Sequence, residues 1–321
     1  MKRVVTVGEL LLRLSPPGEE RLLASPQLET CFGGAEANVA VALSHLGVPC
    51  DYVTRLPANP LGDAGLAALA REGVGTDWIT RGGERLGLYF VESGTDLRTM
   101  RVVYDRAGSA FAGIDPRALD WSRVLAGAAW IHGTGITPAL GDGPAQVLAA
   151  AIAHARAARI PVSFDLNYRE ALWRGRDPRP LITPLVRQAD LLIGNAAAAT
   201  AMLGLEDGDG RLPARLAAQL GCRLVAVTRR ELLGPREQRW SAVLYDAATG
   251  RQHESRQHEV CVVDRVGGGD SFAAGLVAKL LAGDAPDRAL EFAVAAGALK
   301  LTLSGDFSRA SVRDVDAWLG R

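Results

Sequence analysis

The sequence lacks a net charge, because 36 lysine and arginine residues balance 36 aspartate and glutamate residues among 321. A balanced chain of this kind offers no general attraction to nucleic acid or to an anionic membrane. No apolar run reaches membrane-spanning length, and the run at residues 4–7 is too short and too quickly interrupted for a signal peptide. We therefore expect a soluble, cytoplasmic protein with no nucleic-acid or membrane partner.

Cysteine is scarce as well, and the four cysteines lie too far apart in the sequence to form a metal-ligand pair. Scattered cysteines fit reduced thiols in a cytosolic protein, where most serve as small buried hydrophobic side chains. Hydrophobic residues make up 48% of the chain, which suffices for the core of one large α/β domain. No composition break or linker divides the sequence, so we predict a single domain over residues 1–321.

The most informative segment is residues 264–270, where Gly267, Gly268 and Gly269 precede an apolar run. Three residues without a Cβ atom let backbone N–H groups close around a bulky ligand. The apolar run at residues 271–281 predicts a helix whose N-terminus faces this turn. Unpaired N–H groups and the positive end of the helix dipole make such a terminus a site for phosphate oxygens.

Asp270 places a carboxylate at this predicted phosphate site, so it needs a separate role. Phosphoryl transfer supplies one, because it requires a base that orients an attacking hydroxyl and takes its proton. A structural interpretation stays open, in which Asp270 caps the helix and the glycines form only a tight turn.

The first third of the chain contains a second glycine-led helix and a predicted hairpin. Gly33 and Gly34 open a helix that Gly47 closes, and this pair serves either as a plain turn or as a close approach for a ligand. Prolines in residues 10–32 favour extended structure over helix. Residues 86–92 and 100–106, with Gly94, Thr95 and Asp96 between them, predict a β-hairpin.

The middle of the chain has a regular spacing. Short β-rich runs are centred near Ile131, Phe164, Ile193 and Ala226, at separations of 33, 29 and 33 residues. Helical stretches lie between the runs, so the pattern predicts βαβ units and a mostly parallel, doubly wound sheet. Ligands of such sheets bind beyond the carboxyl ends of the strands. The polar residues that follow these runs are His132, Asp165, Asn167, Arg169, Asn195 and Thr228.

Two motifs together, Gly-Gly-Ala-Glu-Ala-Asn at residues 33–38 and Asp-Arg-Val-Gly-Gly-Gly-Asp at residues 264–270, resemble the two signatures of the ribokinase-like (PfkB) carbohydrate kinases. The resemblance covers essentially the whole chain. It implies a ribokinase-like α/β fold, with helices around a doubly wound, mostly parallel sheet, and a small β-sheet lid contributed by about residues 10–32 and 85–111. A P-loop kinase is disfavoured independently, because no Gly-x-x-x-x-Gly-Lys-Ser/Thr motif occurs.

Within that family the chain looks most like the subgroup that phosphorylates 2-keto-3-deoxygluconate. That resemblance implies ATP-dependent transfer to the terminal hydroxyl, giving 2-keto-3-deoxy-6-phosphogluconate. Such a substrate is a sugar acid, so its carboxylate needs cationic partners, for which Arg106 and Arg169 are the candidates. The segments that carry this likeness are residues 8–10, 86–90, 104–110, 164–169, 172–173, 264–267, 299–300 and 305–307.

The resemblance also implies a role for each candidate residue. Asp270 would be the base, and the glycine turn would hold the migrating phosphoryl group, with Mg²⁺ bound by phosphate oxygens and water rather than by protein ligands. The expected sites are Gly267, Gly268, Gly269 and Asp270 for catalysis; Gly34, Tyr89, Tyr104, Arg106, Arg169 and Asp306 for the sugar acid; and Asn167, Asn195 and Thr228 for the nucleotide.

One departure from the family keeps other functions open. The family commonly has a glutamate three residues after the asparagine at position 195, where it helps to place the water molecules on Mg²⁺, and this chain has Ala198. The alternatives are a kinase for a neutral sugar, such as fructose or ribose, and a non-catalytic sensor of sugar acid or nucleotide with the same fold. Because lids of this family often pair, we also expect a homo-oligomer.

Overall fold

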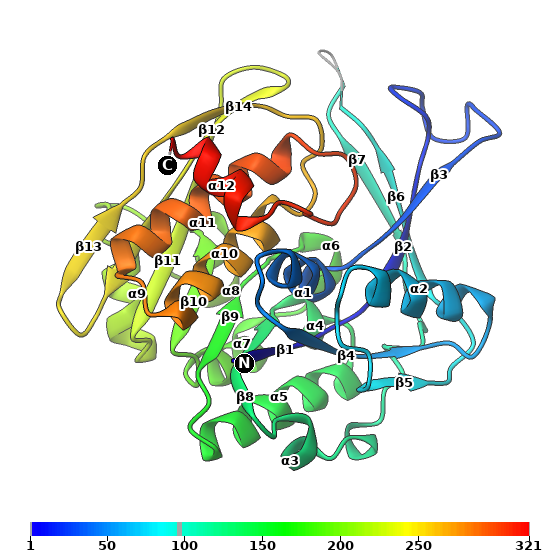
Figure 1. Ribbon diagram of the computed structural model, residues 1–321, viewed down its shortest axis with the longest axis horizontal. Helices are drawn as coiled ribbons and strands as arrows, with labels where there is room; N and C mark the ends of the chain where they lie inside the picture. Colours follow the sequence, from blue (N-terminus) through cyan, green and yellow to red (C-terminus); the bar gives the residue numbers. More distant parts are fainter. Residues whose placement is uncertain (1, 95–97, 321) are drawn as a thin grey trace.

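The computed structural model of the chain describes residues 2–94 and 98–320. A large twisted sheet carries helices on both faces, and a separate small sheet rises from one end of it (Figure 1). This arrangement confirms the predicted ribokinase-like α/β fold. Thr95 and Asp96, which we placed in the hairpin turn, lie outside the described residues.

The large sheet is mostly parallel, as the βαβ spacing predicts. Its strand order is β13-β12-β11-β10-β9-β8-β1-β4-β5, with β14 paired to β12, and only β12, β13 and β14 run antiparallel to their neighbours. The four predicted strand centres fall in β8, β9, β10 and β11, which are neighbours in that order. Their carboxyl ends therefore meet at one edge. The strands are β1 (Arg3–Val7), β4 (Cys50–Leu56), β5 (Ile79–Arg81), β8 (Ala128–Thr134), β9 (Val162–Asp165), β10 (Leu191–Asn195), β11 (Leu224–Leu232), β12 (Glu237–Asp246), β13 (Arg251–Glu254) and β14 (His258–Cys261).

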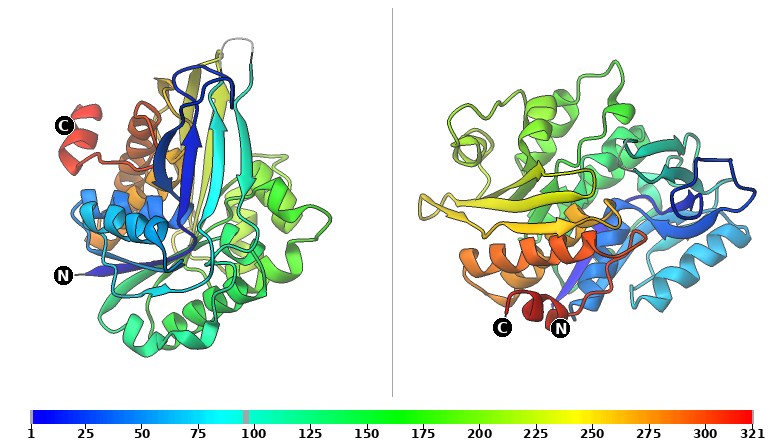
Figure 2. Two further views of the ribbon diagram at one scale, coloured as in Figure 1. Left: turned by 90° about the vertical axis from the view of Figure 1, so that its right-hand side faces the viewer. Right: turned by 90° about the horizontal axis from the view of Figure 1, so that it is seen from above.

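Helices cover both faces of the large sheet because its strands carry apolar side chains on both faces. Val4 packs into one core and Val5 into the other, and Leu191 and Leu192 divide in the same way. Figure 2 shows the two helix layers on opposite sides of the sheet. The first layer contains α1 (Ala35–His45), α2 (Pro60–Arg71), α10 (Gly268–Ala282), α11 (Pro286–Leu301) and α12 (Val312–Trp318). The second contains α3 (Trp121–Val124), α4 (Ile136–Ala139), α5 (Asp142–Ala157), α6 (Glu170–Trp173), α7 (Arg179–Val186), α8 (Ala196–Leu203) and α9 (Leu212–Leu220), with the short 3₁₀ turn η1 (Pro116–Ala118).

The small sheet consists of β2 (Leu11–Ser15), β3 (Glu29–Gly33), β6 (Gly87–Glu92) and β7 (Arg101–Asp105), in the order β3-β2-β6-β7. The pair β6–β7 is antiparallel, in agreement with the predicted hairpin. Leu11, Tyr89 and Val91 are buried on one face, because alternate strand residues point to the same side. That face overlooks the carboxyl edge of the large sheet.

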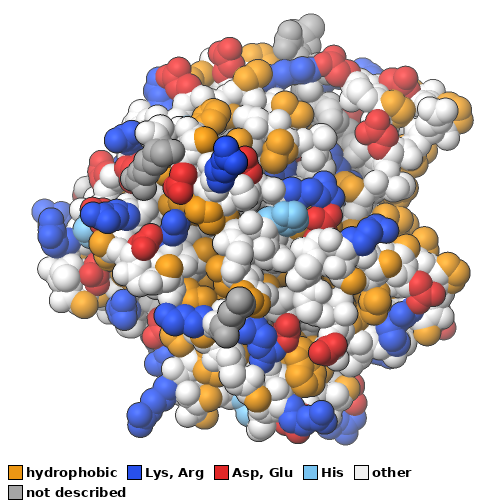
Figure 3. Space-filling model, viewed as in Figure 1, with side chains coloured by type: hydrophobic (Ala, Val, Ile, Leu, Met, Phe, Trp, Pro, Cys, Tyr) orange, Lys and Arg blue, Asp and Glu red, His pale blue; other side chains and the backbone are white. Residues whose placement is uncertain are grey.

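Helix ends follow local signals in the sequence. The Asn59 side chain accepts hydrogen bonds from the N–H groups of Leu61 and Gly62, and Pro60 occupies the first turn, so α2 begins where these residues predict. Within the described residues, no helix is both long and apolar enough to cross a membrane. Acidic and basic side chains are interspersed on the face shown in Figure 3, as expected for a chain of balanced charge.

Candidate active site

A pocket of about 660 Å³ lies where the carboxyl edge of the large sheet meets the small sheet and the N-termini of α1 and α10. The parallel topology explains this position, because the carboxyl ends of β9 and β10 and residues 227–230 of the neighbouring β11 all lie there. Thirteen candidate residues were chosen from the sequence, and the fold brings every one of them to the wall of this single pocket. They are Gly34, Tyr89, Tyr104, Arg106, Asn167, Arg169, Asn195, Thr228, Gly267, Gly268, Gly269, Asp270 and Asp306.

The glycine turn is shaped by contacts that a side chain would prevent. Gly267 has a φ of +86°, and a Cβ atom there would collide with the carbonyl oxygen of Asp306. Gly269 differs, because a Cβ atom at that position would meet nothing within 4 Å. The first N–H groups of α10 have no acceptor inside the helix. The turn therefore presents free donors to an open part of the pocket.

Asp270 is the third residue of α10, and the helix is capped by Gly267. The interpretation of Asp270 as the helix cap is therefore wrong. Its buried carboxylate instead accepts hydrogen bonds from the Nδ2 atoms of Asn38 at 2.7 Å and Asn167 at 3.4 Å. Burial raises the pKa of Asp270 to about 6, against the opposing effect of these amides and of Arg169. The group is thus mostly ionised at pH 7 and able to accept a proton.

Two more carboxyl groups lie near Asp270. Burial and the charge of Asp270 raise the pKa of Asp165 to about 7. Burial also raises the pKa of Glu36, whose Oε1 accepts hydrogen bonds from the hydroxyl groups of Thr134 at 2.8 Å and Thr137 at 2.7 Å. The described residues contain no group of three or more His, Cys, Asp or Glu side chains arranged to hold a metal ion.

Position 198, where the family resemblance led us to look for a glutamate, is occupied by an alanine in the first turn of the helix that follows Asn195. The Asn195 Oδ1 atom accepts a hydrogen bond from the backbone N–H of Ala198 at 2.9 Å, so this side chain caps α8. Ala198 itself is buried. Position 198 thus contributes no charge to the pocket, although Asn195 and Thr228 both line it.

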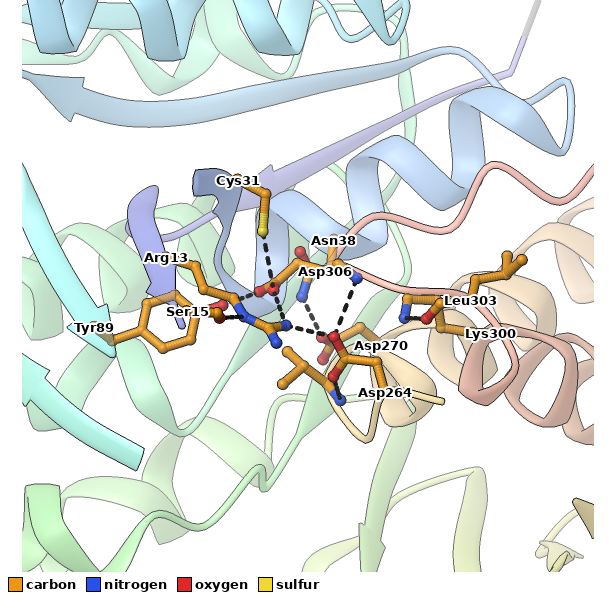
Figure 4. A network of polar contacts seen from close by, with 12 residues as sticks. Arg13, Ser15, Cys31, Asn38, Tyr89, Asp264, Asp270, Lys300, Leu303 and Asp306 are labelled. Atoms are coloured by element: carbon orange, nitrogen blue, oxygen red, sulfur yellow. Dashed lines mark hydrogen bonds and ion pairs between the residues drawn. The ribbon is translucent and has the colours of Figure 1, made fainter. Parts of the chain in front are cut away.

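A buried polar network joins the small sheet to the glycine turn (Figure 4). Arg13 of β2 contacts Asp264 at 2.6 Å and Asp306 at 3.1 Å through Nη1, and its Nε atom donates to Ser15 at 2.9 Å. The Tyr89 hydroxyl donates to Asp306 as well. Two carboxylates that flank the turn in space are therefore held by one cation from the opposite sheet.

The comparison with known families decides the assignment. The family model of the pfkB family carbohydrate kinases matches residues 1–311. The chain belongs to this family. ATP and Mg²⁺, the cofactors expected from the sequence, are those that PfkB kinases use.

Relatives of this PfkB kinase are similar to it over nine tenths or more of their length. A 2-dehydro-3-deoxygalactonokinase of Haloferax volcanii is 33% identical, with 98% of this chain and 95% of the relative covered. A 2-dehydro-3-deoxygluconokinase of Thermoproteus tenax is 30% identical, with 95% and 90% covered. The crystal structure of a 2-dehydro-3-deoxygluconokinase from Thermotoga maritima shares 38% identity and covers 100% of both chains, with a TM-score of 0.96.

The two arginines expected to meet a sugar acid in this kinase have different surroundings. Arg106 is buried, and its Nε and Nη2 atoms donate to Glu9, which also accepts a hydrogen bond from Ser109. Its guanidinium group lies 5.5 Å from the centre of the Tyr104 ring. The Arg169 side chain, in contrast, is exposed and makes no hydrogen bond or ion pair with any residue that the structure describes. Arg169 is therefore the cation with unused donors, while Arg106 shares its charge with Glu9.

Sequence reasoning missed several residues of this site. Arg13, Glu9 and Asn38 each contact a candidate residue, and Lys300 lies fully buried behind the turn with its Nζ atom 3.1 Å from the carbonyl oxygen of Leu303. Asn38 belongs to the first glycine motif, and so its partner could have been suspected. Glu9 follows a strand, but nothing local points to Arg106, which lies 97 residues away.

Proposed function

We propose that this PfkB kinase transfers the terminal phosphoryl group of ATP to the terminal hydroxyl of 2-keto-3-deoxygluconate, also called 2-dehydro-3-deoxygluconate. The observation that supports the proposal most directly is that one pocket is lined both by Asp270, in the first turn of α10 beside the glycine turn, and by the exposed Arg169. The names of the relatives from Thermoproteus tenax and Thermotoga maritima support this choice of substrate.

In the proposed reaction Asp270 takes the proton of the acceptor hydroxyl as its oxygen attacks phosphorus. The amides of Asn38 and Asn167 hold the carboxylate in place and favour its ionised form. Backbone N–H groups at Gly267, Gly268 and Gly269 would face the negative charge that builds up on the transferred group. Bound Mg²⁺ would add charge neutralisation at the phosphate oxygens.

The sugar end of the pocket is proposed to recognise a carboxylate. Arg169 offers a free planar guanidinium, and guanidinium groups bind carboxylates through two parallel hydrogen bonds. Tyr89 and Tyr104, whose ring centres lie 5.9 Å apart, form an aromatic wall beside Arg106. We assign to Gly34 main-chain contact with substrate hydroxyls, because it lines the pocket and has no side chain to cover its backbone.

Arg169→Ala tests this recognition. We expect the KM for the sugar acid to rise more than tenfold, a loss of about 1.4 kcal/mol or more, with little change for a neutral sugar. Arg174→Ala is the matched control, because Arg174 is exposed nearby and does not line the pocket. A sugar-acid KM that stayed within tenfold would contradict the carboxylate contact. Arg106→Ala is a less direct test, since it also leaves buried Glu9 without its cation.

A panel of substrates separates the alternatives. The Haloferax volcanii relative is named for the galactonate epimer, so that sugar acid belongs in the panel with the gluconate form, fructose and ribose. ADP release should be fastest with a 2-keto-3-deoxy sugar acid. Faster turnover of fructose or ribose would favour the neutral-sugar kinase. If the protein bound sugar acid and ATP but released no more ADP than one molecule per enzyme, the result would favour the sensor. That alternative is motivated by Ala198, which stands where the family commonly has a glutamate.

We also propose a cytoplasmic homo-oligomer. The free cysteines suit a reducing compartment. Strand β7 is an edge of the small sheet, and Val103 within it and Met100 just before it expose apolar side chains. A single-chain mass in light scattering at micromolar concentration would contradict the assembly, and recovery of the protein outside the cytoplasmic fraction would contradict the location.

A further inference from the structure

The glycine-turn end of the pocket carries two arginines that lack acidic partners. Arg230 of β11 and Arg265, just before the turn, both line the pocket. The Arg230 side chain makes no hydrogen bond or ion pair with any residue in the described part of the chain, and the Arg265 side chain donates only to the carbonyl oxygen of Pro235 at 2.9 Å. This hydrogen bond fixes Arg265 against the β11–β12 turn.

Strand register places further polar groups on the same face as Arg230. Side chains alternate along a strand, so Thr228 and Arg230 point to one side of β11. Trp240 of β12 pairs directly with Arg230, and Gln238 lies two residues along on that side. Gln238 is 1% exposed, and neither its amide nitrogen nor its amide oxygen finds a partner among the described residues. This face of the hairpin therefore has several donors with no protein acceptor.

Other arginines of the hairpin are paired with carboxylates. Arg229 lies 3.6 Å from Glu254, Arg236 contacts Glu19, and Arg239 bridges two glutamates. The Arg230 side chain has no such carboxylate, and partial burial, together with the positive charge of Arg265, lowers its pKa from the ordinary value. Two guanidinium groups without carboxylate partners at the wall of one pocket leave their donors free for an anion from outside the chain.

We propose that Arg230 and Arg265 form a clamp for the phosphates of the donor nucleotide, a site that rests on the proposed kinase function. Planar guanidinium groups bind phosphate oxygens through paired hydrogen bonds and carry a permanent charge. The clamp lies beside Gly267, where the transferred phosphoryl group is proposed to bind. The two arginines neutralise negative charge on the nucleotide phosphates. This matters in a pocket where Ala198 contributes no carboxylate to position metal-bound water.

ADP binding measured by calorimetry in the presence of EDTA tests the clamp directly. Arg230→Ala and Arg265→Ala should each weaken ADP binding about tenfold, because each removes a charge-assisted contact, and the double variant should lose more. Adenosine lacks phosphates, so its affinity should stay within twofold of the wild-type value. Arg239→Ala is the matched control, since it removes an arginine from the same hairpin but away from the pocket.

An ADP affinity within twofold of wild type in the double variant would overturn the clamp, as would equal weakening of ADP and adenosine. Arg230→Gln keeps the stem of an exposed side chain, and it should reproduce the selective ADP effect in a protein with the wild-type melting temperature. The proposed function is judged separately, by ADP release from the wild-type protein. Normal turnover with an unchanged ADP affinity in the variants would refute the clamp alone, whereas absent turnover in the wild type would refute the kinase function.

Discussion

Replacing Arg13 with glutamine should destabilise the protein strongly, although Arg13 touches neither Asp270 nor Arg169. Its side chain is 7% exposed, and those of Asp264 and Asp306 are 7% and 2% exposed. The substitution leaves two carboxylates without their cation in a region of low dielectric constant. Removing one partner from a buried ion pair costs about 3–5 kcal/mol of unfolding free energy.

The size of this loss should depend on pH with a definite sign. Burial raises the pKa of Asp306 above its ordinary value, and Arg13 opposes that effect. Without Arg13 the folded-state pKa of Asp306 rises further, so the folded variant keeps a proton at Asp306 to a higher pH than the unfolded chain does. Stability then falls as pH rises, by up to about 1.4 kcal/mol per pH unit for each such carboxyl group. The difference between wild type and variant should therefore be larger at pH 8 than at pH 6.

Urea unfolding followed by tryptophan fluorescence at both pH values provides the measurement. Arg117→Gln serves as the control, because it removes an 89% exposed guanidinium from an ion pair with Asp115 and should leave the unfolding free energy unchanged. A loss below 1 kcal/mol for Arg13→Gln, or an equal loss at pH 6 and pH 8, would refute the reasoning about the buried network.

Three further outcomes are expected. Asp270→Asn should lower kcat by about 10²–10⁴-fold and leave sugar and ADP binding intact, and a near-normal kcat would rule out the base. Below about pH 6 the kcat/KM of the wild type should fall about tenfold per pH unit, because Asp270 must lose its proton to act as the base, and a pH profile with no such limb would contradict that role. Gly269→Ala should keep the melting temperature but lose turnover, because its methyl group would enter the open pocket, whereas Gly267→Ala should lower the melting temperature by colliding with Asp306. A lower melting temperature for Gly269→Ala than for Gly267→Ala would contradict the assigned turn geometry.

Local and periodic features of the sequence determined the large sheet and the place of the pocket. Runs of apolar residues about 30 positions apart require parallel strands with helices between them, and parallel strands deliver their following residues to one edge. For that reason Asn167, Asn195, Thr228 and the turn at Gly267 could be selected without coordinates. Glycine at 267 was informative because only a residue without a side chain fits its backbone conformation and its contact with Asp306.

Only the tertiary structure decided which charges neutralise one another. Arg13 lies 251 residues from Asp264, and in the sequence Leu-Leu-Arg-Leu-Ser it resembles a solvent-facing position of a strand. It is buried because the small sheet places it over the glycine turn. The pairing of Glu9 with Arg106 and the unpaired state of Arg230 arise in the same way. Ion pairs depend on distances across the folded chain, and neither hydrophobic periodicity nor turn residues specify those distances.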